Sequence, residues 1–201
     1  MEIEVKYSPV SSAQAQALFA DDALSAPAGE CTCLQMRTVY YDDTLHRLSG
    51  NGWTLRLRQE NEKSICTFKA RVSRLARLEL ETEAADIQQG ALVLAKHPEM
   101  PAAAAQVLED GSFFPTCGAE FVRQVQLRRR GETTFALSWD QGTLWREQLR
   151  EPFTEAELEL ASGEEQALET LAEEYRRKHG LTVCKDSKQQ RARRLGRESA
   201  V

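Results

Sequence analysis

Three charged side chains alternate at the start of the chain: Glu2, Glu4 and Lys6. The residues at positions 3, 5 and 7 are apolar, so the period of two predicts a strand over residues 2–7 with one charged and one apolar face. Carboxylates, water and substrate phosphates are the usual ligands of Mg²⁺, and a nearby lysine supplies a point charge for a phosphate. The stretch therefore predicts a divalent cation bound beside a phosphate group. The alternative is an edge strand whose charges face solvent.

Later stretches repeat this alternation of charged and apolar residues, although each taken singly also fits a strand whose polar face is solvated. The expected strands are 35–41, 53–58, 64–71, 77–83, 121–130, 133–140, 143–149 and 153–161. The charged residues on them that could build a site are Arg56, Arg58, Lys69, Glu79, Glu81, Arg123, Asp140, Glu155, Glu157 and Glu159. Trp53 has the opposite strand parity to Arg56, so we expect it to pack in the core.

Helical spacing and turn residues occupy the remainder of the chain. The expected helices are 10–19, 87–96, 101–108, 164–179 and a short one from Asp186 or Ser187 to Leu195, and a short turn or helix follows Asp42 as far as Leu48. Loops or turns are expected at 21–30, 50–52, 60–63, 110–111, 131–132 and 141–142. The short turns imply that most neighbouring strands are antiparallel.

These elements predict an α+β fold built on eight or nine strands. About eight antiparallel strands can close into a barrel whose inner face encloses a small polar ligand. We therefore expect a closed antiparallel barrel with a charged interior, a tunnel, covered outside by the apolar stripes of the helices. Unpaired charges inside it would be costly to desolvate, whereas water, a cation and a polyanion make the arrangement tolerable.

Length and composition point to one domain over residues 1–201, since 201 residues with 41% hydrophobic content suffice for one sizeable core. The formal net charge of -5 argues against nonspecific nucleic-acid binding. The five cysteines are irregularly spaced, and we expect reduced thiols that bind no metal. The sequence has neither an 18-residue apolar run nor a signal-peptide pattern, so we expect a cytoplasmic protein that does not enter a membrane.

The order of the motifs along the chain is more informative than any one of them. In chain order they are Glu2-x-Glu4-x-Lys6, Tyr40-Tyr41-Asp42, Leu55-Arg56-Leu57-Arg58, Thr67-Phe68-Lys69, the acidic strand with Glu79 and Glu81, Arg123, Trp139-Asp140, the Glu-x-Glu strand near Glu157, and Asp186-Ser187-Lys188. This succession covers nearly the whole chain and resembles the CYTH superfamily, the triphosphate tunnel metalloenzymes. That superfamily includes inorganic triphosphatases, thiamine triphosphatases and class IV adenylate cyclases.

The resemblance implies a role for each matching residue. The cations that would bind the triphosphate are Lys6, Arg56, Arg58, Lys69, Arg123 and Lys188. The carboxylates that would hold Mg²⁺ or Mn²⁺, directly or through water, are Glu2, Glu4, Asp140, Glu155, Glu157 and Glu159. The residues expected to act in catalysis are Glu2, Glu4, Lys6, Glu79 and Glu81. The late Glu-x-Glu pair could be Glu155/Glu157 or Glu157/Glu159, and we prefer the second because Leu160 and Ser162 then precede the helix at about the expected distance.

The implied activity is metal-dependent hydrolysis of a phosphoanhydride bond, with inorganic triphosphate as the first choice of substrate. The Leu-Arg-Leu-Arg segment followed by Gln59-Glu60-Asn61, together with the late Glu-rich strand, resembles bacterial inorganic triphosphatases. Thiamine triphosphatase and adenylate cyclase are the alternatives within the superfamily. A noncatalytic module that binds polyphosphate or nucleic acid is the alternative outside it, although no aromatic residues interleave with the arginine runs at 128–130 and 191–197. The sequence leaves a homodimer open.

Overall fold

The computed structural model describes residues 2–24, 31–73 and 76–197, with residue 2 placed by its backbone alone. Of the loop expected over 21–30, residues 25–30 lie outside the described residues. The strands are β1 (Glu2–Tyr7), β2 (Thr32–Asp42), β3 (Thr54–Glu60), β4 (Lys63–Arg71), β5 (Ala76–Glu83), β6 (Phe114–Arg130), β7 (Thr133–Arg146) and β8 (Leu149–Ser162). The helices are α1 (Ser12–Phe19), α2 (Arg47–Gly50), α3 (Ile87–Ala95), α4 (Ala102–Asp110), α5 (Glu165–Lys178) and α6 (Lys188–Arg194).

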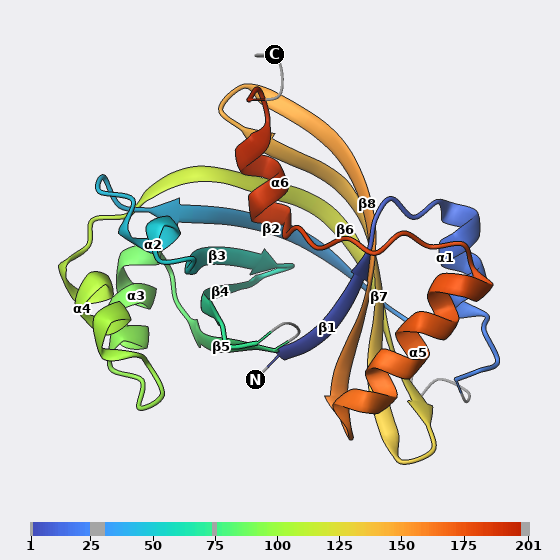
Figure 1. Cartoon of the computed structure of the whole chain (residues 1–201). Helices are drawn as coiled ribbons and strands as arrows, with labels where there is room; N and C mark the ends of the chain where they lie inside the picture. Colours follow the sequence, from blue (N-terminus) through green and yellow to red (C-terminus); the bar gives the residue numbers. More distant parts are fainter. Residues whose placement is uncertain (1, 25–30, 74–75, 198–201) are drawn as a thin grey trace.

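The strands close into an antiparallel barrel in the order β1-β5-β4-β3-β2-β6-β7-β8 (Figure 1). Short turns join β3 to β4, β6 to β7 and β7 to β8, whereas a segment that contains α2 joins β2 to β3. The first strand lies between β5 and β8, and β2 pairs with β6. The barrel with flanking helices confirms the fold class expected from the alternating strands. The strand at the N-terminus closes the barrel, because its residues from Glu4 to Tyr7 pair with Ala156 to Glu159.

The turn expected at residues 141–142 is wrong, because β7 runs without interruption through Gly142. A Cβ at this glycine would lie 2.1 Å from the carbonyl oxygen of Glu120 and 2.4 Å from Cβ of Phe121. The glycine therefore serves close strand packing and does not mark a turn. The expected strand 143–149 is the second half of β7, and the chain reverses instead at Glu147, whose φ is 54°.

The sixth strand begins at Phe114, seven residues before the expected start at 121. This part contains Pro115 and Gly118, and proline and glycine are both uncommon in strands. The sequence pattern therefore did not predict a strand here. Gly118 is required because a Cβ there would lie 2.4 Å from the ring of Trp145. The longer strand pairs with β2 along residues 114–125 on one edge and with β7 along residues 118–130 on the other, and so joins the two halves of the barrel.

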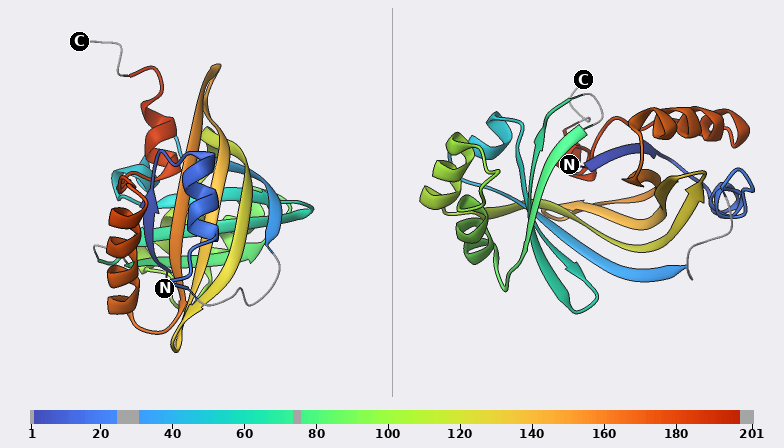
Figure 2. Two further views of the ribbon diagram at one scale, coloured as in Figure 1. Left: turned by 90° about the vertical axis from the view of Figure 1, so that its right-hand side faces the viewer. Right: turned by 90° about the horizontal axis from the view of Figure 1, so that it is seen from below.

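Two apolar clusters cover the outside of the barrel on opposite sides (Figures 1 and 2). One packs α3 and α4 against β3, β4 and β5, with Phe68 and Leu55 fully buried. The other packs α1 and α5 against β1, β7 and β8, with Leu158 and Tyr175 fully buried. Because the apolar side chains of these strands point outward under helices, the opposite faces are free to line a polar interior.

The last helix takes a different position, against the inner face of the long strands. Ala192 of α6 is buried in a third cluster with Phe121, Leu144 and Phe153. Ser187 caps its N-terminus, and the side chains and backbones of Ser187 and Gln190 form a capping box. This cap fixes the direction in which Lys188, the first residue of the helix, leaves the backbone.

All five cysteines are free thiols in the structure. Within the described residues, no helix combines the length and the apolar character that crossing a membrane requires.

We predict that Phe68→Ala lowers the free energy of unfolding by about 3–5 kcal/mol, because it leaves a cavity beneath α3 and α4. Urea denaturation followed by circular dichroism measures this loss. Val72→Ala is the control, since Val72 is 58% exposed and its truncation should change the free energy by no more than about 0.5 kcal/mol. Equal losses in both variants would contradict the placement of Phe68 in the outer cluster.

Candidate functional site

The interior of the barrel contains a cavity of about 770 Å³ with a charged wall. The charged residues that line it are Glu4, Lys6, Arg56, Arg58, Lys69, Arg71, Arg77, Glu79, Glu81, Arg123, Glu155, Glu157, Glu159, Lys188 and Arg193. These residues come from β1, β3, β4, β5, β6, β8 and α6. Among the described residues of the wall, lysines and arginines outnumber carboxylates, so the enclosed field favours an anion despite the negative charge of the whole chain.

One wall is formed by three neighbouring strands, β3, β4 and β5. Arg56 Nη2 lies 3.2 Å from Oε1 of Glu79, and Lys69 Nζ lies 2.9 Å from the same oxygen. Arg58 Nη2 lies 2.6 Å from Oε1 of Glu60 and 3.4 Å from Oε1 of Glu81. The antiparallel register sets Lys69 directly opposite Glu79, whereas Arg58 and Glu60 lie two residues apart on the same strand.

Burial and a neighbouring positive charge both disfavour the charged form of Arg58 on this wall. Burial, and then the nearby charge of Arg56, lower the pKa of Arg58, although Glu60 and Glu81 act in the opposite direction. Its Nε atom is buried and has no hydrogen-bond partner within the described part of the chain. A buried donor without an acceptor is costly, and an anion in the cavity could supply the acceptor.

The N-terminal strand contributes a second group. Lys6 Nζ donates a hydrogen bond of 2.9 Å to Oε1 of Glu4, which also accepts one from Arg77 Nη1. Glu4 lies opposite Glu159 of β8, and Lys6 lies opposite Glu157. The first charged motif of the sequence therefore meets the last acidic strand inside the barrel, and the backbone of Glu2 pairs with Arg77 on the other side.

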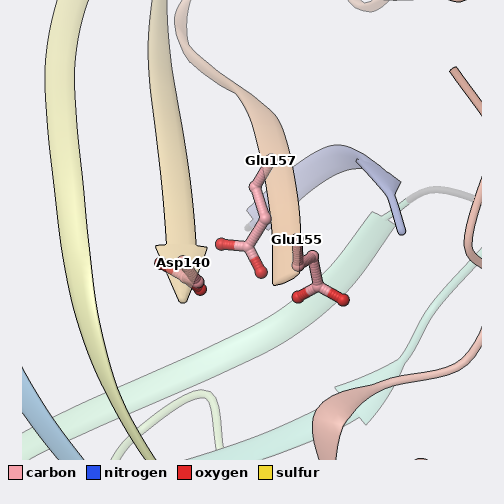
Figure 3. Close-up of side chains that lie close together, drawn as sticks. All are labelled: Asp140, Glu155 and Glu157. Carbon is pink, nitrogen blue, oxygen red and sulfur yellow. The ribbon is translucent and has the colours of Figure 1, made fainter. Parts of the chain in front are cut away.

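Three carboxyl groups, those of Asp140, Glu155 and Glu157, gather on the inner side of β7 and β8 (Figure 3). Each offers one oxygen atom within 4.8 Å of the others, and all three residues are buried. Register again explains the cluster: Asp140 lies opposite Glu155 on the neighbouring strand, and Glu157 is two residues further along the same face.

Cations surround this carboxylate cluster. Arg123 donates two hydrogen bonds to Asp140, at 2.7 Å from Nε and 2.8 Å from Nη2, and a further one to Glu157. Lys188 Nζ lies 2.8 Å from both Asp140 Oδ2 and Glu157 Oε1 and also contacts Glu155 Oε1. The second helical cation, Arg191, lies 2.6 Å from Oε2 of Glu155.

The pKa values of the cluster follow from burial and from these cations. Burial raises the pKa of Glu155 to about 7, against the opposing effect of Lys188. Burial acts in the same direction on Glu157, but Arg123 and Lys188 outweigh it and hold the pKa of Glu157 well below its usual range. The three carboxyl groups in turn raise the pKa of Lys188 well above its usual value, although burial opposes this. Lys188 is therefore a charged ammonium inside the barrel.

The cluster fits a divalent metal by the chemistry of its donors. Hard ions such as Mg²⁺ prefer oxygen ligands, and three converging carboxylates supply them. Glu155 and Glu157 share this group with Asp140, whereas Glu159 lies further along β8 beside Glu4, on the wall of the same cavity. The pair preferred from the sequence, Glu157 and Glu159, is thus part of a longer acidic row that includes Glu155.

Sequence reasoning missed several residues that line or support the site. Arg77 alternates with Glu79 and Glu81 on the charged face of its strand, but nothing in the sequence connects it with Glu4, which lies on a strand far away in sequence. Arg191 gave no signal beyond its place in an arginine-rich segment. Phe121 and Phe153 looked like ordinary strand residues, yet their rings lie 5.3 Å and 5.7 Å from Lys188 Nζ.

Trp53 occupies a position that strand parity did not anticipate. Its ring centroid lies 5.9 Å from that of Phe68, as expected for a core residue, but Trp53 is also among the residues that line the cavity. The reason is that β3 begins at Thr54, so Trp53 precedes the regular alternation of the strand. Asn51 lines the cavity beside it.

The profile of the CYTH domain matches residues 1–192. The chain belongs to the CYTH domain family. No protein of curated function matches the chain significantly.

Solved structures agree with this assignment at the level of the fold. A candidate adenylyl cyclase from Hippeastrum, described as having a dominant triphosphatase activity, superposes with a TM-score of 0.62 at 22% identity, covering 93% of this chain and 91% of that one. A candidate adenylate cyclase from Bacillus halodurans gives 0.58 at 16% identity, covering 93% and 94%. The PH1819 protein from Pyrococcus horikoshii gives 0.57 at 18% identity, covering 94% and 97%. The shared architecture is the CYTH barrel.

We predict that Asp140→Asn lowers the free energy of unfolding by about 3–5 kcal/mol, because the fully buried Asp140 carboxylate is the shared partner of Arg123 and Lys188. Chemical denaturation at neutral pH measures the change. Glu174→Gln is the matched control: it removes a pair with Arg130 in which both side chains are about two-fifths exposed, which should cost at most about 1 kcal/mol. A loss for Asp140→Asn no larger than that of the control would show that the buried pairs do not stabilise the fold.

Proposed function

We propose that the chain is a metal-dependent triphosphatase that hydrolyses inorganic triphosphate to pyrophosphate and phosphate. The observation that carries the proposal is the enclosed cavity in which lysines and arginines from most of the barrel strands converge and outnumber the carboxylates. Membership of the CYTH domain family and the triphosphatase activity named for the Hippeastrum protein support the same reaction class.

In this proposal two groups of basic residues bind different parts of a linear phosphate chain. Arg56, Arg58 and Lys69 line one wall, while Lys6 and Arg123 approach from β1 and β6. Their present partners are carboxylates, so a phosphate chain would accept hydrogen bonds that these cations now donate to Glu79, Glu81 and Glu157. Phosphoryl transfer requires chiefly this positioning and stabilisation of charge, and little covalent chemistry from the protein.

The acidic residues have a separate role. Asp140, Glu155 and Glu157 would hold the metal ion, with Glu4 and Glu159 next to them on the cavity wall. A bound Mg²⁺ or Mn²⁺ supplies Lewis-acid charge neutralisation to phosphate oxygens. Glu79 and Glu81 hold the arginines and Lys69 in place, and a carboxylate of this interior orients the attacking water.

Two other substrates deserve direct comparison. Thiamine triphosphate and ATP carry an aromatic group beyond the triphosphate, and Trp53 with Asn51 lines the same cavity. An aromatic side chain at a cavity wall can stack on such a group. Preference for either compound would change the assigned substrate and leave the site the same.

Two residues of the arginine runs make contacts within the chain. Arg128 is buried and donates hydrogen bonds to the carbonyl oxygens of Phe19, Asp21 and Leu24, so it holds the end of α1 in place. Arg194 pairs with Asp186, with its Nη1 atom 2.6 Å from Oδ2. These side chains therefore serve the fold.

The test is phosphate release from triphosphate, thiamine triphosphate and ATP, each with Mg²⁺, with Mn²⁺ and with no metal. We expect release from triphosphate to be fastest and to require a metal. Release that is equally fast without metal would exclude the metal-dependent mechanism, and binding of polyphosphate without any release would identify a noncatalytic module.

In the same assay we expect Glu4→Gln to lower kcat by about a hundredfold or more, because it removes a negative charge from the reacting region and keeps the side-chain volume. Glu83→Gln is the control, since Glu83 lies at the end of β5 and is exposed. Activity of Glu4→Gln equal to that of the control would remove Glu4 from the mechanism.

A second prediction concerns stability with bound anions. The cations of the cavity repel one another in the protein alone, so a bound polyanion should raise Tm. Ligand at a hundredfold excess over Kd stabilises the native state by about 2.7 kcal/mol. We expect triphosphate to raise Tm more than pyrophosphate, and pyrophosphate more than orthophosphate, in a thermal shift series without metal at fixed ionic strength. Equal shifts, or shifts abolished by moderate salt, would place the charges on an open surface.

A further inference from the structure

The side chain of Lys188 is buried, although the first residue of a helix can equally well point to solvent. Its ammonium contacts Asp140, Glu155 and Glu157, and its side chain is only 9% exposed. The rings of Phe121 and Phe153 lie close to the same nitrogen, where the negative face of an aromatic ring favours a cation. The carboxylate cluster thus already surrounds one compact positive charge.

The contacts of this ammonium are those that a small metal ion would take from the same residues. Lysine carries its charge on a single atom with three donors, and here the three neighbouring carboxyl groups each accept one contact. A divalent ion bound by these carboxylates would lie within a few ångströms of Nζ, where two like charges repel strongly. The ion and the ammonium therefore cannot share the cluster.

Lys188 can leave the cluster without undocking the helix. Arg191 holds α6 through Glu155 and through Oγ of Ser8, at 2.9 Å from Nη1. At the other end, Arg146 donates hydrogen bonds to the carbonyl oxygens of Arg193 and Leu195. Lys188 lines the cavity and has a flexible four-carbon stem, so its ammonium can move toward the cavity while its backbone stays in place.

We propose that Lys188 is an internal cation that occupies the Asp140/Glu155/Glu157 cluster, and that a divalent metal ion binds there only by displacing it. The displaced ammonium then points into the phosphate-binding cavity, so metal loading and the availability of this lysine for substrate are coupled. This inference rests on the metal site of the proposed function.

The first experiment measures Mn²⁺ affinity without triphosphate, by calorimetry or by the electron paramagnetic resonance of free Mn²⁺. Lys188→Met keeps the stem and removes the competing charge, so we expect its Kd for Mn²⁺ to be at least about tenfold lower than that of the unaltered protein. Lys188→Arg retains the charge and should not gain affinity in this way. Lys185→Met, at an exposed neighbouring position, should match the unaltered protein.

The second experiment uses the unaltered protein and stays decisive if Lys188→Met does not fold. Acetic anhydride labels amines that are accessible and not ion-paired, and mass spectrometry reports the labelling of each lysine. We expect the labelling rate of Lys188, relative to the exposed Lys185, to rise by at least about threefold when Mn²⁺ is added, because the displaced amine leaves its carboxylate partners and reaches solvent in the cavity.

Unchanged or weaker Mn²⁺ affinity in a folded Lys188→Met variant, or no binding of Mn²⁺ to either protein, would overturn the proposal. Unchanged or slower labelling of Lys188 in Mn²⁺ would do the same. Metal-dependent phosphate release by the unaltered protein together with such a result would reject only the displacement of Lys188 and leave the triphosphatase function standing.

Discussion

The pairing of opposite charges inside a closed barrel is the constraint on which this structure depends. Asp140 and Glu155 are completely buried, and each is held by cations from other elements. A buried charge without a partner costs several kcal/mol, so the interior is stable only while strand register keeps acids and bases opposite each other. The register that sets Arg123 against Asp140, and Asp140 against Glu155, is therefore as important as the residue types themselves.

The outside of the barrel makes this interior possible. Helices α3 and α4 cover the apolar faces of β3, β4 and β5, and α1 and α5 cover those of β1, β7 and β8, so these faces have partners away from the cavity. The inner face of β6, β7 and β8 presents Phe121, Leu144 and Phe153 where α6 packs against it through Ala192 and Leu195. One helix thus completes the core and brings Lys188 to the carboxylates.

The same pairing has a consequence for binding. The cations that would hold a phosphate chain already donate to carboxylates, and the carboxylates that would hold a metal already accept from Arg123, Lys188 and Arg191. When a ligand binds in such a site, the charged side chains exchange one ionic partner for another. The ligand does not bind to side chains that were unpaired before. The free energy available for binding is the difference between the two sets of contacts, which relates affinity directly to the stability of the protein alone.

The sequence by itself determined the barrel, most of its strands and the polarity of its faces, because period-two alternation is a local property of each strand and short turns imply antiparallel neighbours. The pattern misplaced a turn at Gly142 and the start of β6. Glycine and proline indicate turns when only neighbouring residues are considered, whereas the close packing that requires these glycines is visible only in three dimensions. Tertiary structure alone decided that Arg77 meets Glu4, and that Lys188 contacts all three of the carboxylates Asp140, Glu155 and Glu157. These contacts join strands and a helix distant in sequence, and their distances follow from register and barrel closure, which no single segment encodes.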